Sequence, residues 1–441
     1  MRVLYCDYGT YCDFAISKQI ITNLLKNRNH VFYITSDENQ QISQLSDPHL
    51  EVVRYTSPSV KDVIPFADNR NMIYALLDIR KVFKTIGVLV RQSKTFNFIV
   101  DTVKSQWQSM DMLLFTYPLM CIVRRLITSS SLPPRLPMVV LYVAPAFPNI
   151  YIPWIFDERI IDLQTDIVSS KDKDMKVRSH VWNDVAVSLC GEKREFINLF
   201  WGYKDNKKYL MKRFPNLYVI SAWNKGLIPP EVAPINVPPS HWFSINGIFE
   251  RSQPKPLLPS IVREFLKKPG KLLYLTLGSM ETTELHSFVK VLQKAIKGKD
   301  MKLLVHDSQK QLRRRSTDHL LIVSGFLPYT SILPKTTLLI TTGSYCIQHL
   351  ALYYHVPMLF VPVLTEQYFW AKNYQQQTGI PYVDDMTYSK HNVQSVSETI
   401  SLILSSTTLK KWLDQQSKNI KKTNGAKEAT KVLQKIIQIR S

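Results

Sequence analysis

The sequence predicts an α/β protein of two Rossmann-like domains, each a doubly wound parallel sheet, facing each other across a cleft. Three observations predict this. Short apolar strands alternate with amphipathic helical segments early in the chain, and the same alternation begins again after residue 270. A proline-rich stretch, residues 233–259, separates the two halves. The length of 441 residues is sufficient for two domains of ordinary size.

In the first half, a short apolar segment begins the chain, and apolar residues at helical spacing follow it over residues 14–25. Further apolar runs, bounded by polar or turn-forming residues, predict more strands. The strands are expected at residues 2–6, 30–35, 50–55, 111–115 and 137–143. Because helical segments separate strands, the sheet is expected to be parallel.

The second half repeats the pattern. Strands are expected at residues 271–277, 302–306, 320–323, 338–341 and 357–361, and helices at residues 261–267 and 285–296. The end of the chain, residues 395–439, is expected to be helical and amphipathic. The resulting division is an N-terminal domain over residues 1–240, a linker over 241–258, a C-terminal domain over 259–425 and a final helix. That helix, residues 426–441, is expected to pack back on the N-terminal domain.

The composition is that of a globular protein, with 45% hydrophobic and 21% charged residues. The longest uncharged stretch, residues 136–156, contains four prolines, so it fits a buried strand and a loop better than a membrane-spanning helix. The five cysteines are scattered and form no CxxC pair, which indicates neither a disulfide framework nor a zinc site. These features predict a soluble protein of the cytoplasm.

The formal net charge of +21 points to an anionic partner or to a solvated basic face. Basic residues cluster at 313–315 and along the C-terminal helix. No nucleic-acid-binding motif accompanies them, so nucleic acid is not expected as a partner. Three explanations of the charge remain open: a phosphorylated substrate, peripheral contact with an anionic membrane, and a basic face that only aids solubility.

Two glycine turns follow apolar strands in the second half. Gly278 and Ser279 follow the first strand, and Thr342, Gly343 and Ser344 follow the fourth and precede a helical segment. Glycine lets the backbone approach a phosphate, and hydroxyls and free amides can donate hydrogen bonds to it without a metal. The plainer alternatives are tight turns and helix caps.

A carboxylate and an amide, Glu366 and Gln367, follow the next expected strand at a strand-to-helix loop. Such a pair can bind vicinal sugar hydroxyls, because the carboxylate accepts hydrogen bonds and the amide both donates and accepts them. Taken alone, the pair is more typical of a solvated loop.

The run from Thr341 to Ile380 resembles the signature of the UDP-glycosyltransferase superfamily. Four residues match it at the expected spacing: Gly343, Pro357, Pro362 and Gln367. Trp370 makes the run most similar to the sterol and glycopeptide-antibiotic branch. Other segments also resemble family motifs, namely Leu275–Ser279 of the donor domain, the Gly325–Pro328 segment that packs on the uracil, and the Gly9–Asp13 loop of that branch.

The resemblance implies the two-domain GT-B fold, inversion at the anomeric carbon and no metal or cofactor. It places a nucleotide sugar, with UDP-glucose as the first candidate, against Gly278, Ser279, Phe326, Leu327, Thr342, Gly343, Ser344, Glu366 and Gln367. The chain departs from the pattern in several places. Thr342 replaces the histidine that contacts the donor phosphate, Ser344 replaces a glycine, and His355 stands at a position that is usually glycine.

Asp13 lies where the sterol and antibiotic branch carries its catalytic aspartate, so the resemblance assigns it as the base. The alternative is that Asp13 only caps a helix that begins near Phe14. The acceptor is expected to be a small or lipophilic molecule, since residues 145–156 are apolar and aromatic, although ordinary core residues would look the same. A degenerate homologue that binds a partner or membrane without catalysis is the other functional hypothesis.

Overall fold

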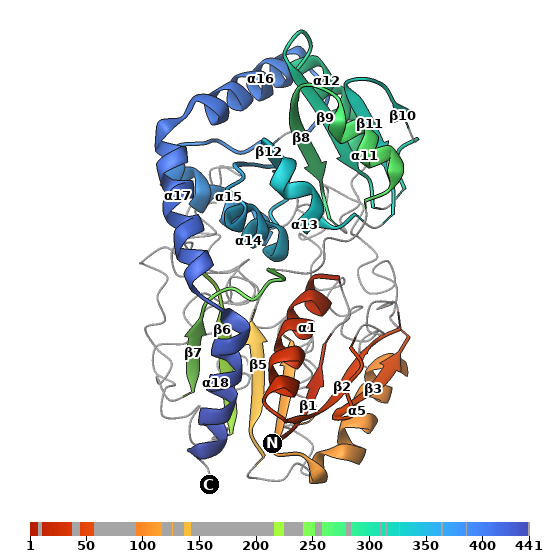
Figure 1. Ribbon diagram of the computed structural model, residues 1–441, viewed down its shortest axis with the longest axis vertical. Helices are drawn as coiled ribbons and strands as arrows, with labels where there is room; N and C mark the ends of the chain where they lie inside the picture. Colours follow the sequence, from red (N-terminus) through yellow and green to blue (C-terminus); the bar gives the residue numbers. More distant parts are fainter. Residues whose placement is uncertain are drawn as a thin grey trace, which may run out of the picture. The chain divides into compact units, whose positions relative to one another are not determined.

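A computed structural model of the chain confirms the predicted α/β class with two Rossmann-like units (Figure 1). It describes residues 1–7, 11–37, 45–56, 94–116, 126, 136–142, 216–224, 241–251, 258–278, 284–308, 310–313, 315–325, 327–362, 365–384 and 386–439. The first unit comprises Met1–Ile248 and Asn424–Ser441, and the second comprises Phe249–Thr423.

The first unit is built on a sheet in the order β3-β2-β1-β4-β5-β6-β7, in which every described pair of neighbours is parallel. This order is that of a doubly wound dinucleotide-binding sheet. The strands are β1 (Arg2–Cys6), β2 (His30–Ser36), β3 (Leu50–Tyr55), β4 (Met112–Thr116), β5 (Met138–Tyr142), β6 (Leu217–Ala222) and β7 (Trp242–Ile245).

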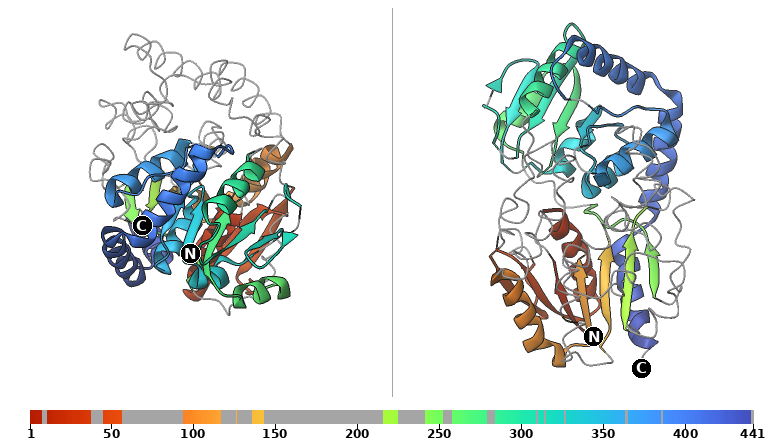
Figure 2. Two further views of the ribbon diagram at one scale, coloured as in Figure 1. Left: turned by 90° about the horizontal axis from the view of Figure 1, so that it is seen from above. Right: turned by 180° about the vertical axis from the view of Figure 1, so that it is seen from behind.

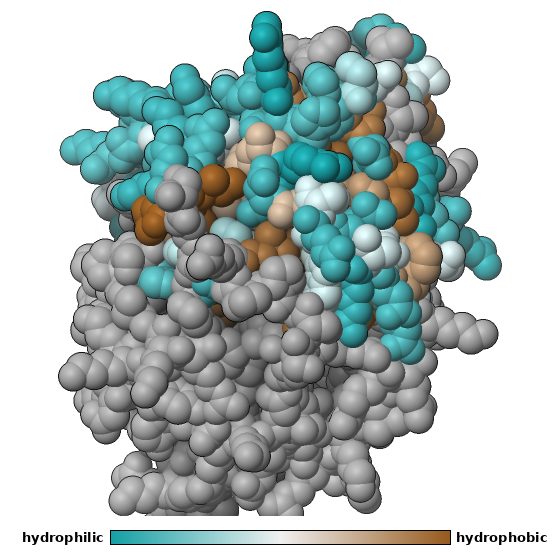
Figure 3. Space-filling view, turned by 90° about the horizontal axis from the view of Figure 1, so that it is seen from below, coloured by the Kyte–Doolittle hydropathy of each residue, from teal (hydrophilic) through white to brown (hydrophobic). Residues whose placement is uncertain are grey.

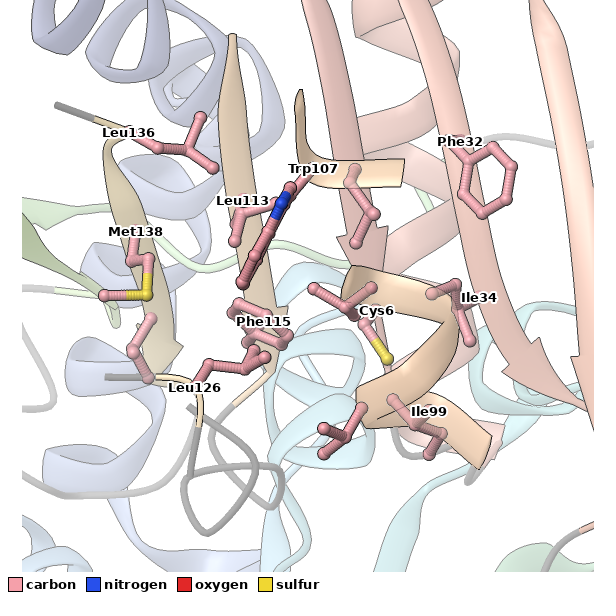
Figure 4. Packing of buried hydrophobic residues seen from close by; sticks show 14 of the residues in the cluster. Cys6, Phe32, Ile34, Ile99, Trp107, Leu113, Phe115, Leu126, Leu136 and Met138 are labelled. Carbon is pink, nitrogen blue, oxygen red and sulfur yellow. The ribbon is translucent and has the colours of Figure 1, made fainter. Parts of the chain in front are cut away.

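Helices cover both faces of this sheet (Figures 1 and 2). One face carries α1 (Tyr11–Lys26) and α18 (Gly425–Gln438), and the other carries α5 (Lys94–Gln106), which continues as a 3-10 turn over Trp107–Ser109. On the α5 side, alternate strand residues form a buried apolar cluster with Trp107 and Leu126 (Figure 4). In β1, Leu4 and Cys6 enter this cluster while Val3 and Tyr5 point to the opposite face and are also buried, as expected for a strand covered on both faces.

The second unit has the strand order β10-β11-β9-β8-β12-β13, parallel except where the short β10 pairs antiparallel with β11. Its strands are β8 (Lys271–Thr276), β9 (Met301–His306), β10 (Arg315–Ser316), β11 (Leu320–Val323), β12 (Leu338–Thr341) and β13 (Met358–Phe360). Its helices are α11 (Ser260–Lys267), α12 (Leu285–Ala295), α13 (Tyr329–Ile332) with the 3-10 turn Leu333–Lys335, α14 (Tyr345–Tyr353), α15 (Thr365–Thr378), α16 (Lys390–Ser405) and α17 (Thr407–Lys422).

The local predictions missed two strands and one helix break. The strands β6 and β7 were not predicted, and β7 lies inside the expected linker 241–258, where an edge strand of four residues between prolines gives little periodic signal. The helical end expected over residues 395–439, with a final helix from residue 426, consists of three helices that begin at Lys390. Ser389, Ser406 and Asn424 cap α16, α17 and α18 through their side chains, and the break at Ser406 was not predicted.

Candidate functional site

The second sheet reverses its direction of winding between β8 and β12. From β8 the chain adds β9 and β11 on one side and then returns to place β12 and β13 on the other. In an open parallel sheet, ligands bind outside the carboxyl ends of the strands at such a switch point. The loops after β8 and β12 are therefore where a ligand of this unit is expected, and they are the two glycine turns that the sequence singled out.

The two turns have the same construction. Thr276 ends β8 and Thr341 ends β12, and the two threonines are opposite each other in the parallel register. Each threonine Oγ1 accepts a hydrogen bond from the amide of the glycine two residues later, Gly278 in one turn and Gly343 in the other, at 3.3 Å in both. Two matched turns thus stand side by side at the switch point.

Both turns require glycine because their φ angles are positive, +67° at Gly278 and +89° at Gly343. Gly343 is also closely packed, since an added Cβ would lie 2.6 Å from Cδ1 of the buried Phe360 ring. The Gln348 side chain donates a hydrogen bond to the Gly343 carbonyl and fixes the turn from the helix that follows.

The helix α14 begins directly after the second turn. Ser344 precedes its first residue, yet the Ser344 side chain makes no capping hydrogen bond. The first intrahelical bond of this turn runs from the Gln348 amide to the Ser344 carbonyl, so the amides of the first turn have no partner within the helix. These amides and the helix dipole favour an anion at this position. The view of Ser344 as a simple side-chain cap does not hold.

The remaining predicted donor residues are at the same edge or outside the described residues. Thr342 and Leu327 are buried, and Leu327 follows the end of β11. Glu366 and Gln367 are the second and third residues of α15, which follows β13, so they begin a helix and do not lie in a loop. The Gln367 side chain is 3% exposed, whereas the Glu366 side chain, Ser279 and Phe326 lie outside the described part.

The sequence reading missed His306 and Ser308, which stand at and just after the carboxyl end of β9. The His306 ring lies 2.7 Å from the carbonyl oxygen of Gly325 and 3.1 Å from the Tyr274 hydroxyl. The Ser308 hydroxyl donates a hydrogen bond to the Gly278 carbonyl. No local motif marks these two residues, because their partners come from the neighbouring strands β8 and β11.

The first unit has its own switch point, between β1 and β4, and α1 follows β1 there. Asp13 is the third residue of α1, which begins at Tyr11 and not near Phe14, so Asp13 lies inside the first turn and does not precede the helix. Its side chain lies outside the described part of the chain.

A second aspartate was not singled out from the sequence. Asp7 follows β1 and is fully buried, and its carboxylate accepts hydrogen bonds from Tyr33 and from Thr35, the latter at 2.6 Å. Burial, followed by the negative charge of Asp7, raises the pKa of the Tyr33 phenol well above its usual range, so this phenol stays a donor. Asp7 thus anchors the end of β2 to the strand that leads to α1.

The described surface shows no extended apolar face. The exposed large hydrophobic residues are spread over separate elements, and the face drawn in Figure 3 is mostly hydrophilic where it is described. None of the described helices combines the length and apolar character needed to span a bilayer.

By sequence, no protein-family profile and no curated protein matches the chain. By structure, solved glycosyltransferases are similar over nearly the whole length. The kitacinnamycin glycotransferase has a TM-score of 0.62 at 14% identity, with 99% of each chain covered. The calicheamicin glycosyltransferase CalG4 has a TM-score of 0.61 at 14% identity, with 99% of this chain and 98% of that one covered.

A third solved structure, the glycosyltransferase VinC in complex with dTDP, has a TM-score of 0.58 at 15% identity, with 99% of this chain and 100% of that one covered. At identities this low, the structural similarity establishes the fold alone. The chain therefore shares the fold of these solved glycosyltransferases, with two Rossmann-like units.

Proposed function

We propose that the chain is an inverting, metal-independent glycosyltransferase that moves a sugar from a nucleoside diphosphate sugar to a hydroxyl of a small or lipophilic acceptor. The single observation that carries this is the pair of matched Thr-x-Gly turns at the switch point of the second unit. The threonines fix the two turns by accepting hydrogen bonds from the glycine amides, and the first-turn amides of α14, which follow the second turn, suit the oxygens of a diphosphate.

UDP-glucose is our first candidate donor. The solved structure of VinC holds dTDP and that of the rhamnosyltransferase SpnG holds thymidine diphosphate, so a thymidine nucleotide is the competing candidate for this chain. Leu327 is buried beside the turn at Gly325, and the family resemblance assigns it to contact with the nucleobase of the donor.

The proposed reaction is a single displacement. The Asp13 carboxylate takes the proton of the acceptor hydroxyl as that oxygen bonds to the anomeric carbon. On the opposite side, the bond from the anomeric carbon to the diphosphate oxygen breaks, and the nucleoside diphosphate leaves with the electron pair. The turns at Gly278 and Gly343 and the first-turn amides of α14 stabilise the charge on the leaving diphosphate.

The test is a calorimetric titration of the full chain with UDP, dTDP and their glucose conjugates, in buffer with and without EDTA. Micromolar binding of one nucleotide that persists in EDTA is the expected result. The absence of binding by any of these ligands at millimolar concentration would contradict the donor site, and binding restored only by added magnesium would contradict the metal-free mechanism.

Recognition of the sugar is assigned to Glu366 and Gln367 at the beginning of α15. Alanine substitutions at these positions are expected to weaken UDP-glucose binding about 5- to 150-fold, since polar groups left unpaired typically cost about 1–3 kcal/mol. Binding of UDP alone should change little. Equal losses for UDP and UDP-glucose would show that these side chains do not select the sugar.

The second candidate function is a non-catalytic partner- or membrane-binding protein. Thr342, at the position of the family histidine, is buried and cannot carry charge, which weakens the case for donor binding. The helix α17 also exposes five lysines, which suit an anionic surface: Lys410, Lys411, Lys418, Lys421 and Lys422. Co-sedimentation with phosphatidylserine vesicles, combined with a failure to bind nucleotides, would favour this function.

A further inference from the structure

His306 links the carboxyl ends of three neighbouring strands. It is the last residue of β9, and in the parallel registers it is opposite Thr276 of β8 on one side and Val323 of β11 on the other. Its ring is 7% exposed. One ring nitrogen, Nε2, lies 2.7 Å from the Gly325 carbonyl oxygen, and the other, Nδ1, lies 3.1 Å from Tyr274 Oη and 3.4 Å from Thr276 Oγ1.

The partners of the two ring nitrogens fit one neutral tautomer. A carbonyl oxygen only accepts hydrogen bonds, so Nε2 carries a hydrogen. Nδ1 faces the Tyr274 hydroxyl, which can donate or accept, and burial favours the neutral ring in which Nδ1 is the acceptor. Burial lowers the pKa of His306, although the hydrogen bond to the Gly325 carbonyl and the negative charge of Asp307 act in the opposite direction.

The same contacts reach two glycine turns. Thr276, beside Nδ1, uses its Oγ1 to accept from the Gly278 amide at 3.3 Å, and Ser308, two residues after His306, donates to the Gly278 carbonyl. Gly325 itself has a φ of +91°. The turns after β8 and β11 thus converge on one side chain, which lies between them.

The groups that face the ring make it sensitive to protonation. Tyr274 from β8 and Tyr329 from α13 flank the imidazole, and the centroid of each tyrosine ring lies 6.4 Å from that of the His306 ring. Asp307, the neighbouring acid, directs its carboxylate to the Leu312 amide at 2.6 Å. A proton on Nδ1 would reverse the hydrogen bond, with the Tyr274 hydroxyl as its acceptor, and it would place a charge in a buried setting.

We propose that His306 is a positioning residue of the donor site, whose neutral imidazole holds the turns at Gly278 and Gly325 in place, so that nucleotide binding weakens when His306 is protonated. This inference rests on the proposed function, because it assumes that a nucleoside diphosphate binds at these turns. His306 touches the turns and not the reacting atoms.

Three substitutions separate the two ring nitrogens. In His306→Gln, the side-chain amide can donate to the Gly325 carbonyl as Nε2 does. In His306→Asn, the side-chain oxygen can accept from the Tyr274 hydroxyl as Nδ1 does. In His306→Leu, both hydrogen bonds are lost. The matched control is His319→Gln, an exposed histidine at the amino end of β11 in the same sheet. Ser308→Ala removes the second support of the Gly278 turn without touching the imidazole.

UDP affinity is measured by calorimetry for each variant between pH 7.5 and 4.5, with circular dichroism to verify the fold. At pH 7.5 we expect about tenfold weaker binding for His306→Leu, and about threefold for the Gln, Asn and Ser308→Ala variants, in line with the loss of one or two buried hydrogen bonds. The terminal phosphate of UDP takes up a proton at about pH 6, and the resulting change in UDP affinity is the same for all variants.

The distinguishing result is the pH profile. The native chain, His319→Gln and Ser308→Ala should show an additional loss of affinity below pH ~6.5 that the His306 variants lack. Equal affinity and the same acid dependence in His306→Gln and in the native chain would overturn this inference alone. If the native chain binds no UDP or dTDP at millimolar concentration, the proposed function falls and this inference falls with it.

Discussion

Gly343 has less room than the glycine of the matching turn. A Cβ at Gly343 would meet the buried Phe360 ring, whereas a Cβ at Gly278 would meet no atom of the described residues within 4 Å. The ring of Phe360 packs against Tyr374, with centroids 5.1 Å apart, and so has little freedom to move aside. The two positions therefore share the strained φ but differ in packing, which makes them a natural pair of variants.

Gly343→Ala is expected to lower the free energy of unfolding by about 3 kcal/mol, and Gly278→Ala by about 1 kcal/mol. In both variants alanine must adopt a positive φ, which costs about 1–2 kcal/mol for a residue with a Cβ. Only Gly343→Ala adds an overpacking cost of about 1–3 kcal/mol. Urea unfolding of the two variants measures this difference. Equal losses would mean that Phe360 relaxes freely.

The proposed base, Asp13, is tested by a change that keeps the size of the side chain. Asp13→Asn is expected to reduce transfer about 100- to 10,000-fold, because an amide cannot take the proton of the acceptor hydroxyl. Asparagine fits an early helical position, so the fold and UDP binding should persist. Turnover at saturating substrates is measured together with UDP affinity, and a native rate would remove Asp13 from the mechanism.

At the scale of elements, α18 is fixed to the first unit by its first residues. The Glu428 carboxylate accepts hydrogen bonds from the backbone amide of Asn246, at 2.9 Å, and from its side chain. Gly425 begins the helix against backbone, and a Cβ there would lie 2.5 Å from the Gly247 carbonyl oxygen and would clash with that of Asn246. The helix also packs on α1 and β7.

Gly425→Ala is expected to destabilise the first unit by about 2–3 kcal/mol, because backbone atoms cannot move aside as a side-chain tip can. The helix must then shift and weaken the contacts of Glu428. Lys427→Ala, an exposed change in the same turn, serves as the control and should cost less than about 0.5 kcal/mol. Hydrogen exchange of the α18 amides and urea unfolding measure both effects, and protection equal to that of the native chain would contradict the expectation.

At the scale of the whole molecule, buried histidines link stability to pH. His349 of α14 is fully buried, and burial lowers its pKa from 6.5 to about 4, with the charge of Arg251 acting in the same direction and a hydrogen bond to the Tyr345 carbonyl against it. The unfolded chain therefore gains this proton at a higher pH than the folded chain. Stability must fall as the pH drops from about 6.5 to about 4.

The expected contribution of His349 to this loss is about 3 kcal/mol, at about 1.4 kcal/mol per pH unit. His349→Phe removes the titrating group and keeps a buried ring, so its stability should depend less steeply on pH in this window. Urea unfolding at pH 7 and at pH 4.5 measures the slope. The exposed His319→Gln should keep the native slope, and a His349→Phe variant with the same slope would contradict the assignment.

Local patterns in the sequence were enough to predict the two alternations of strand and helix and the positions of the glycine turns. Both are local properties: apolar periodicity defines an element, and a positive φ selects glycine at Gly278 and Gly343. The helix break at Ser406 and the edge strand β7 were not predicted, because a cap and a short edge strand do not change the apolar period.

Which residues contact each other depends on the tertiary structure. The register places Thr341 opposite Thr276, His306 bridges strands 30 residues apart in the chain, and Glu428 reaches Asn246 across 182 residues. Such contacts depend on the order and register of strands, which are set by the packing of the whole sheet and not by any local pattern. For that reason the sequence could name the turns of the candidate site but not the histidine that holds them.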